Sequence, residues 1–198
     1  MFYKVIKRIF DFICALIGII GTSPLWIVGI IGILISDWGP VFYTARRIGK
    51  NNKPFKMYKF RSMTVAHSGS SVSVKGESRI TPLGAKLRKY KLDELPELWN
   101  VLIGDMSFVG PRPDVPGYAD NLKGDDRRML LLKPGITGPA SLKYRNEEEL
   151  LAEQEDPQKY NDEVLFPDKV RINIEYLDNW SFWHDIKIII YTVLGKAL

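Results

Sequence analysis

The chain has 198 residues and a net charge of +5, which is enough for one hydrophobic core and fits one domain. A single cysteine, Cys14, and two histidines, His67 and His184, exclude an internal disulfide framework and a Cys/His zinc cluster. The basic balance favours an anionic partner: nucleic acid, anionic lipid or a phosphorylated substrate.

The first predicted element is an apolar segment over residues 12–36 that contains no charged residue. As one helix it is about 38 Å long, which exceeds a hydrocarbon core of about 30 Å. It is too long for the apolar region of a signal peptide, and no clear small-x-small cleavage site follows. Ser23 and Pro24 lie near its middle, and proline removes a helix hydrogen bond. Two alternatives stay open: a kinked spanning helix, or a helix-break-helix that enters and leaves by one face.

Basic residues flank this segment on both sides, at Lys4, Lys7 and Arg8 and again over residues 46–53. The positive-inside rule favours the cytoplasm for each flank. A re-entrant segment allows that arrangement, whereas a single span does not.

Short strands are predicted next, over residues 41–43 and 55–60, with turn residues over 49–54. Residues 67–78 are rich in serine and glycine and predict an exposed, mobile loop.

A basic helix follows, in which Thr81 is the expected N-cap and Pro82 the first helical residue. Its expected apolar stripe consists of Leu83, Leu87 and Tyr90.

The stretch "KLDELPELWNVL" contains the adjacent acids Asp93 and Glu94 at the start of a second predicted helix. The expected apolar face of this helix is Leu95, Leu98, Trp99 and Leu102, and Gly104 is its expected end. Acids in a first turn commonly cap a helix and suit its dipole, so capping is one interpretation.

A chemical role for the two acids is the alternative. Adjacent residues on a helix diverge, so Asp93 and Glu94 do not form the facing carboxylate pair of a glycosidase. They suit divided roles. One carboxylate attacks a phosphorus, as aspartyl nucleophiles do, and carboxylate and phosphate oxygens together hold Mg²⁺.

Several cations suit phosphate binding. Lys59 shares one strand face with Arg61, Arg88 lies just upstream of the acids, and Arg112 lies between two prolines that restrict its backbone. The alternatives are solvated surface cations and a basic face that binds anionic lipid.

The C-terminal half is expected to be extended over residues 107–114, to turn over 133–138 and to form an acidic surface helix over 146–160. For the apolar helix predicted in the tail, an interfacial position and docking onto the core remain equally open.

The combination resembles the small monotopic phosphoglycosyl transferases of the bacterial sugar transferase family. The matching pieces are the apolar run with "TSP", then "RIGKNNKPFKMYKFRSM", "LDELPELWNVLIGDMSFVGPRP" and "KPGITG". The sequence departs from the family pattern at Ala45, Ser62, Lys133 and over residues 139–146. The last of these departures puts the sugar in doubt, not the reaction.

The resemblance implies an α+β fold, mainly helical and membrane-associated, with short strands and interfacial amphipathic helices. It implies a re-entrant membrane helix over residues 1–38, broken at Ser23 and Pro24, and a catalytic domain over residues 39–198. The domain is expected at the cytoplasmic face of the bacterial inner membrane.

The implied reaction transfers a sugar-1-phosphate, N-acetylated by preference, from a UDP-sugar to polyprenyl phosphate and releases UMP. Asp93 is the expected nucleophile and Mg²⁺ ligand, and Glu94 supports Mg²⁺ or the incoming lipid phosphate. The expected phosphate-binding residues are Lys59, Arg88 and Arg112, and Arg145 is expected to face the nucleotide or sugar.

Membrane lipid is an expected partner and nucleic acid is not, while the oligomeric state stays open. Three alternatives remain: a hexose-1-phosphate transferase for exopolysaccharide or capsule, a membrane phosphohydrolase, and a non-enzymatic basic membrane anchor.

Overall fold

The structure is a computed structural model that describes residues 2–64 and 79–196. The serine- and glycine-rich loop expected over residues 67–78 lies outside the described residues.

A bent pair of helices begins the chain: α1 (Phe2–Gly21) and α2 (Ser23–Ser36), which meet at an angle of 59°. The Ser23 hydroxyl donates to the Ile20 carbonyl at 2.7 Å, and the Thr22 hydroxyl donates to the Gly18 carbonyl at 2.6 Å. Ser23 thereby supplies the hydrogen bond that Pro24 cannot donate. The predicted break at Ser23 and Pro24 is present, and the bent pair fits both a broken span and a re-entrant segment.

No single helix in residues 2–64 and 79–196 is both long and apolar enough to cross a membrane. The bent pair of α1 and α2 reaches the required length and composition only when its two members are taken together.

The strands form two small sheets. β1 (Phe42–Ile48) and β2 (Pro54–Phe60) make an antiparallel hairpin that pairs Tyr43 with Lys59. Its connection contains the turn η1 (Lys50–Asn52). β1 is longer than the predicted strand over 41–43, because its second half carries cations that break the apolar pattern.

β3 (Ser107–Val109) and β4 (Gly135–Thr137) make a parallel pair. β4 corrects the prediction of a turn over 133–138. A strand of three residues is too short to show an alternating pattern.

Between the two sheets lie α3 (Pro82–Lys89), the 3₁₀ turn η2 (Leu92–Glu94) and α4 (Glu97–Ile103). The Thr81 hydroxyl accepts a hydrogen bond from the Gly84 amide at 2.9 Å, and Gly104 ends α4 with a φ of 96°, both as predicted. Two members of the predicted apolar stripes are wrong, because Tyr90 is 65% exposed and Trp99 is 48% exposed.

The remaining elements are mostly helical. The helices are α5 (Pro139–Lys143), α6 (Glu147–Ala152), α7 (Pro157–Tyr160), α8 (Phe166–Asp178) and α9 (Phe182–Leu194). Shorter turns are η3 (Ala119–Asn121), η4 (Gly124–Leu131) and the π-helical η5 (Asn161–Leu165). The acidic stretch is therefore helical in two pieces rather than one.

The tail helix α9 docks onto the core, as one of the two alternatives predicted, and the interfacial position stays a prediction. Asp185 and Ile188 are 1% and 0% exposed in the interior, whereas Trp183 and Val193 are 77% and 80% exposed. One face docks onto the core and the other is an exposed apolar surface.

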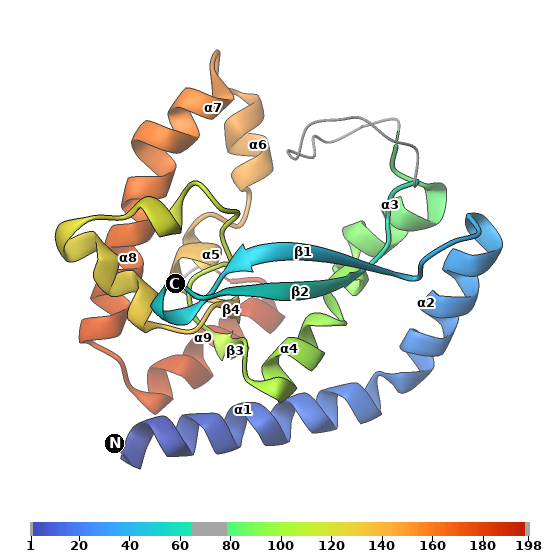
Figure 1. Cartoon of the computed structure of the whole chain (residues 1–198), viewed down its shortest axis with the longest axis horizontal. Helices are drawn as coiled ribbons and strands as arrows, with labels where there is room; N and C mark the ends of the chain where they lie inside the picture. The colour runs from blue at the N-terminus through green and yellow to red at the C-terminus, as the bar shows by residue number, and fades with distance from the viewer. Residues whose placement is uncertain (1, 65–78, 197–198) are drawn as a thin grey trace.

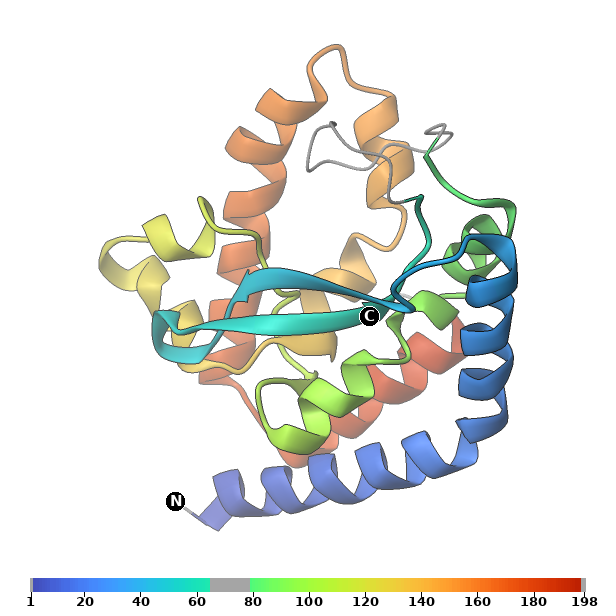
Figure 2. The ribbon, with the colours of Figure 1, turned by 45° about the vertical axis from the view of Figure 1, so that its right-hand side comes forward.

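The arrangement places α4 at the centre. α1 runs along one edge of the molecule, α2 turns away from its end, and the hairpin crosses the middle (Figure 1). α4 lies between the hairpin and α1 (Figure 2), and one buried cluster joins the three through Ala15, Met57 and Val101. The fold is α+β and mainly helical, as predicted, and it holds η2 against β2.

Candidate active site around Asp93

The site lies where η2 and the start of α4 face β2. Asn100 of α4, which is 0% exposed, fixes this contact. Its side-chain oxygen accepts from the Tyr58 amide at 3.0 Å, and its side-chain nitrogen donates to the Lys56 carbonyl at 2.7 Å. The two hydrogen bonds set the position of β2 along α4 and bring Lys59 opposite η2.

Glu94 is held by two cations. Lys59 Nζ donates to Glu94 Oε1 at 2.7 Å, and Arg112 Nη2 donates to the same oxygen at 3.1 Å. Burial opposes ionisation of Glu94, but the charges of Arg112 and Lys59 prevail and lower its pKa to about 2. Glu94 is therefore ionised at every physiological pH.

Asp93 has the opposite environment. It is 8% exposed, and its Oδ1 atom is buried with no hydrogen-bond partner in the described part of the chain. Burial raises the pKa of Asp93; the Lys59 charge opposes this shift and the Glu94 charge adds to it. Within the described residues, neither η2 nor α4 has a side-chain N-cap, so Asp93 and Glu94 are not capping residues, although both lie in the first turn of η2.

Glu97 is a third acid at this site, and the sequence analysis missed it. It is 3% exposed, and its Oε1 atom lies 3.2 Å from Lys59 Nζ. Burial raises the pKa of Glu97 to about 7, with a contribution from the Glu94 charge and against the charge of Lys59. The available signal was its spacing of four residues from Asp93, which places two side chains on one side of a helical segment.

The chain resembles known proteins over nearly its whole length. A family model described as bacterial sugar transferase matches residues 2–197. The chain belongs to the bacterial sugar transferase family.

Three relatives illustrate the range of the family. The chain is 35% identical over 189 residues to "Uncharacterized sugar transferase EpsL" of Bacillus subtilis, covering 96% of this chain and 86% of that protein. It is 34% identical over 196 residues to "UDP-glucose:undecaprenyl-phosphate glucose-1-phosphate transferase" of Escherichia coli. It is 33% identical over 200 residues to "UDP-N-acetylgalactosamine-undecaprenyl-phosphate N-acetylgalactosaminephosphotransferase" of Aeromonas hydrophila. The last two alignments each cover 96% of this chain but only 40% and 43% of the relatives.

In this sugar transferase family member, the cations predicted to bind phosphate do not all behave alike. Lys59 and Arg112 meet at Glu94, and the charge of Arg88 lowers the pKa of Asp93. Arg61 instead lies 3.4 Å from the Asp37 carboxylate, beyond the end of β2. Arg145 lies beside Gly195, at the C-terminal end of α9, and its role toward the nucleotide or sugar stays a prediction.

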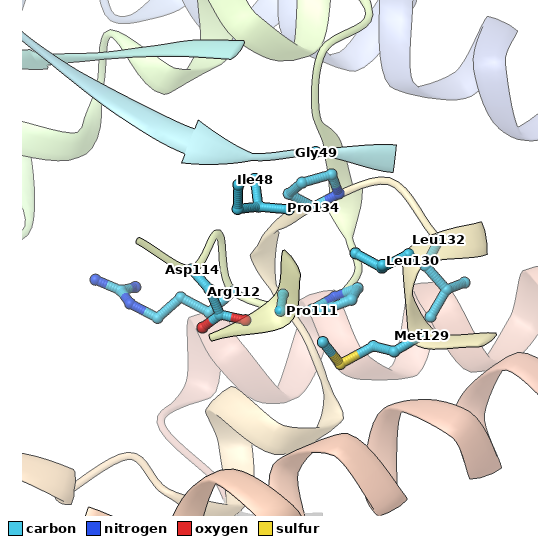
Figure 3. A pocket seen from close by; sticks show the side chains of 10 residues that line it. Ile48, Gly49, Pro111, Arg112, Asp114, Met129, Leu130, Leu132 and Pro134 are labelled. Atoms are coloured by element: carbon cyan, nitrogen blue, oxygen red, sulfur yellow. The ribbon is translucent and has the colours of Figure 1, made fainter. Parts of the chain in front are cut away.

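A small cavity lies behind Arg112 (Figure 3). Its volume of about 20 Å³ holds about one water molecule. The guanidinium of Arg112 extends away from the apolar residues that line this cavity, and the Arg112 side chain is 55% exposed. The outer side of Arg112 is therefore exposed, whereas the cavity is too small for any group larger than water.

The acids at this site suit a magnesium ion that takes only some of its ligands from the protein. Within residues 2–64 and 79–196, no group of three or more His, Cys, Asp or Glu side chains is arranged to hold a metal ion. Mg²⁺ typically uses one or two carboxylates and takes its other ligands from phosphates and water. The unpartnered Oδ1 of Asp93 fits that use.

Proposed function

We propose that this chain is a phosphoglycosyl transferase, which moves a sugar-1-phosphate from a UDP-sugar to polyprenyl phosphate and releases UMP. The activities for which the Escherichia coli and Aeromonas hydrophila relatives are named support the reaction class. The observation that carries the proposal is the contrast between the two adjacent acids. Glu94 is neutralised by Lys59 and Arg112, while an oxygen of Asp93 has no partner among the described residues.

In the first proposed step, an Asp93 carboxylate oxygen attacks the phosphorus that bears the sugar. A bond forms between that oxygen and phosphorus, giving an acyl-phosphate. The bond between the same phosphorus and the oxygen bridging to UMP breaks, and UMP leaves with the electron pair.

In the second step, a phosphate oxygen of the polyprenyl acceptor attacks the phosphorus now attached to Asp93. The bond between Asp93 and phosphorus breaks, which restores the carboxylate and yields a polyprenyl diphosphate sugar. The two steps balance without an oxidant, a reductant or water.

The surrounding charges serve these steps. Lys59, Arg88 and Arg112 would bind phosphate oxygens and offset the repulsion between an anionic nucleophile and an anionic substrate. Mg²⁺, held by Asp93 and the substrate phosphates with support from Glu94, would supply further neutralisation of that charge. Glu94 orders the cations, because Lys59 and Arg112 both contact its Oε1 atom.

The acceptor is a lipid, and the apolar outer surface of α1 and α2 supports a position in the membrane. Its exposed side chains are Ile9, Phe12, Ile13, Leu16, Ile17, Ile20, Leu25, Ile27, Val28, Ile31 and Ile35. A continuous apolar surface of this kind marks a membrane or protein contact. We propose that α1 and α2 form a re-entrant segment from the cytoplasmic face of the bacterial inner membrane, with the exposed face of α9 at the interface.

The donor sugar is proposed to be N-acetylated, with a hexose-1-phosphate transferase for exopolysaccharide or capsule as the alternative. Two relatives of nearly equal identity, 34% and 33%, are named for glucose and for N-acetylgalactosamine. Overall identity therefore does not separate the two classes of sugar.

A UMP-release assay over a panel of UDP-sugars, with and without undecaprenyl phosphate, tests the proposal. We expect sustained UMP release only with both substrates, and at most one equivalent of UMP without the acceptor. Release of free sugar phosphate without an acceptor indicates a phosphohydrolase. Absence of UMP with every donor, together with salt-sensitive lipid binding, indicates a non-enzymatic anchor.

A further inference from the structure

We propose that Glu97 is a positioning residue for the transfer reaction and acts through Lys59, keeping the Lys59 ammonium beside Asp93 while Glu94 engages substrate. The inference rests on the proposed function and adds to it a residue with a defined role.

The first support is geometric. Lys59 Nζ is shared by two carboxylates, lying 2.7 Å from Glu94 Oε1 and 3.2 Å from Glu97 Oε1. The two acids come from different elements, η2 and the first turn of α4. Lys59 therefore has a second carboxylate contact that does not depend on Glu94.

The two acids also differ in depth. The Glu97 side chain is 4% exposed, whereas the side chains of Glu94 and Lys59 are 14% and 16% exposed. Glu94 also contacts Arg112, whose side chain is 55% exposed. A phosphate that binds Arg112 competes first with Glu94, and the deeper contact between Glu97 and Lys59 is retained.

The contact is not required to dock α4 on β2. Asn100 already joins the two elements through the Tyr58 amide and the Lys56 carbonyl. A buried ion pair is also a weak source of stability, because desolvation of both charges offsets their attraction. A structural role does not explain why a carboxylate is buried here.

The pKa of Glu97 reflects the cost of desolvating its carboxylate. Burial, the largest effect, raises its pKa, and so does the charge of Glu94; Lys59 and Arg112 act in the opposite direction. The folded-state pKa is about 7, so stability present at acid pH falls as the pH rises through this value and Glu97 ionises. Removing the charge is therefore expected to leave stability at pH 8 unchanged or raised.

The test compares Glu97→Gln with Glu148→Gln, a matched control at an exposed acid of α6. The first readout is labelling of Lys59 by an amine-reactive reagent at pH 8, measured on its peptide by mass spectrometry. We expect labelling to rise about threefold or more in Glu97→Gln, because the ammonium loses its inner contact, and to be unchanged in the control. Unchanged labelling in Glu97→Gln overturns the proposal.

The second readout is UMP release. We expect kcat to fall about tenfold in Glu97→Gln, with KM for the UDP-sugar within about twofold, because positioning rather than binding is lost. In a Lys59→Met background, Glu97→Gln is expected to add no further loss. An additive loss in the double variant overturns action through Lys59.

A second variant, Glu97→Asp, keeps the charge and shortens the reach, and is expected to label at an intermediate rate. It keeps the test decisive if Glu97→Gln does not fold. A wild-type chain that releases no UMP overturns the proposed function, whereas Lys59 labelling still decides the contact with Glu97.

Discussion

Two buried clusters in this molecule each pair a lysine with acids, and they differ in how completely those acids are satisfied. In the first, Asp185 of α9 is 1% exposed and accepts hydrogen bonds from Lys7 and from the Tyr176 hydroxyl. Trp180 Nε1 donates to it as well, at 3.2 Å. This cluster ties α1 to the C-terminal helices.

In the second cluster, Lys59 faces Glu94 and Glu97, and the neighbouring Asp93 has a buried oxygen without a partner in residues 2–64 and 79–196. Acids outnumber the cations that contact them. Full satisfaction is typical of a structural anchor, whereas an unpartnered buried carboxylate is retained at a cost and marks a site of chemistry. Burial of charge alone therefore does not identify an active site, and the clustering of several acids and cations around an unpartnered carboxylate oxygen distinguishes the second cluster.

The largest expected effect is a loss of activity when Asp93 of the second cluster is changed. Asp93→Asn is expected to reduce UMP release at least about 1,000-fold, because the amide is no nucleophile toward phosphorus. Stability is expected to be unchanged or higher, since the variant removes a buried carboxylate with an unpartnered oxygen. UMP assays and thermal unfolding measure the two quantities, and near-full activity contradicts the assignment of the nucleophile.

The second-largest expected effect is a loss of stability without a loss of activity, in the cluster around Asp185. Asp185→Ala is expected to lower the free energy of unfolding by about 3 kcal/mol, because it leaves a buried lysine and a tyrosine hydroxyl unpaired. Activity per folded molecule is expected to persist. Chemical denaturation in detergent measures the change, with exposed Glu153→Ala as the control. A stability equal to the control refutes the structural role of Asp185.

Removing one of the two cations at Glu94 is expected to have an intermediate effect. Arg112→Met is expected to slow UMP release by about 10- to 100-fold, because one phosphate contact and one partner of Glu94 are lost. Arg112→Lys is expected to recover only part of the rate, since lysine lacks the planar fork. Exposed Arg127→Met is the control, and equal rates in Arg112→Met and the control rule out a phosphate contact.

The smallest expected effect is a displacement of the pH profile. The pKa of Asp93 is raised by burial, so UMP release is expected to decline on acidification at a higher pH than an ordinary aspartate gives. The charge of Lys59 opposes this shift, so Lys59→Met is expected to move the acid limb to still higher pH. Glu94, with a pKa of about 2, does not titrate in this range, whereas Glu97, with a pKa of about 7, does, so both profiles are measured in a Glu97→Gln background. An acid limb unmoved in Lys59→Met contradicts the electrostatic link.

Much of the local structure was predictable because it depends on local chemistry. Pro24 cannot continue the hydrogen bonds of the preceding helix, Thr81 caps the turn that follows it, and Gly104 ends α4. The Asp93–Glu94 pair was also visible as a motif, and Lys59 and Arg112 were expected near phosphate.

The features that the sequence did not predict depend on contacts between residues that are distant in the chain. Glu97 is a common residue in a first helical turn, and only the position of β2 makes it a partner of Lys59. Trp99 fits an apolar stripe by spacing, yet nothing in the spacing shows that its side of α4 is uncovered. Likewise, the contact between Arg61 and Asp37 depends on how α2 leads into the hairpin.

The most direct measurement of the central claim is mass spectrometry of the wild-type chain quenched after mixing with a UDP-sugar in the absence of acceptor. We expect one sugar phosphate added to the peptide that contains Asp93, an equal amount of UMP, and loss of the adduct when undecaprenyl phosphate is added. UMP formed without any adduct, or an adduct on another residue, contradicts the account.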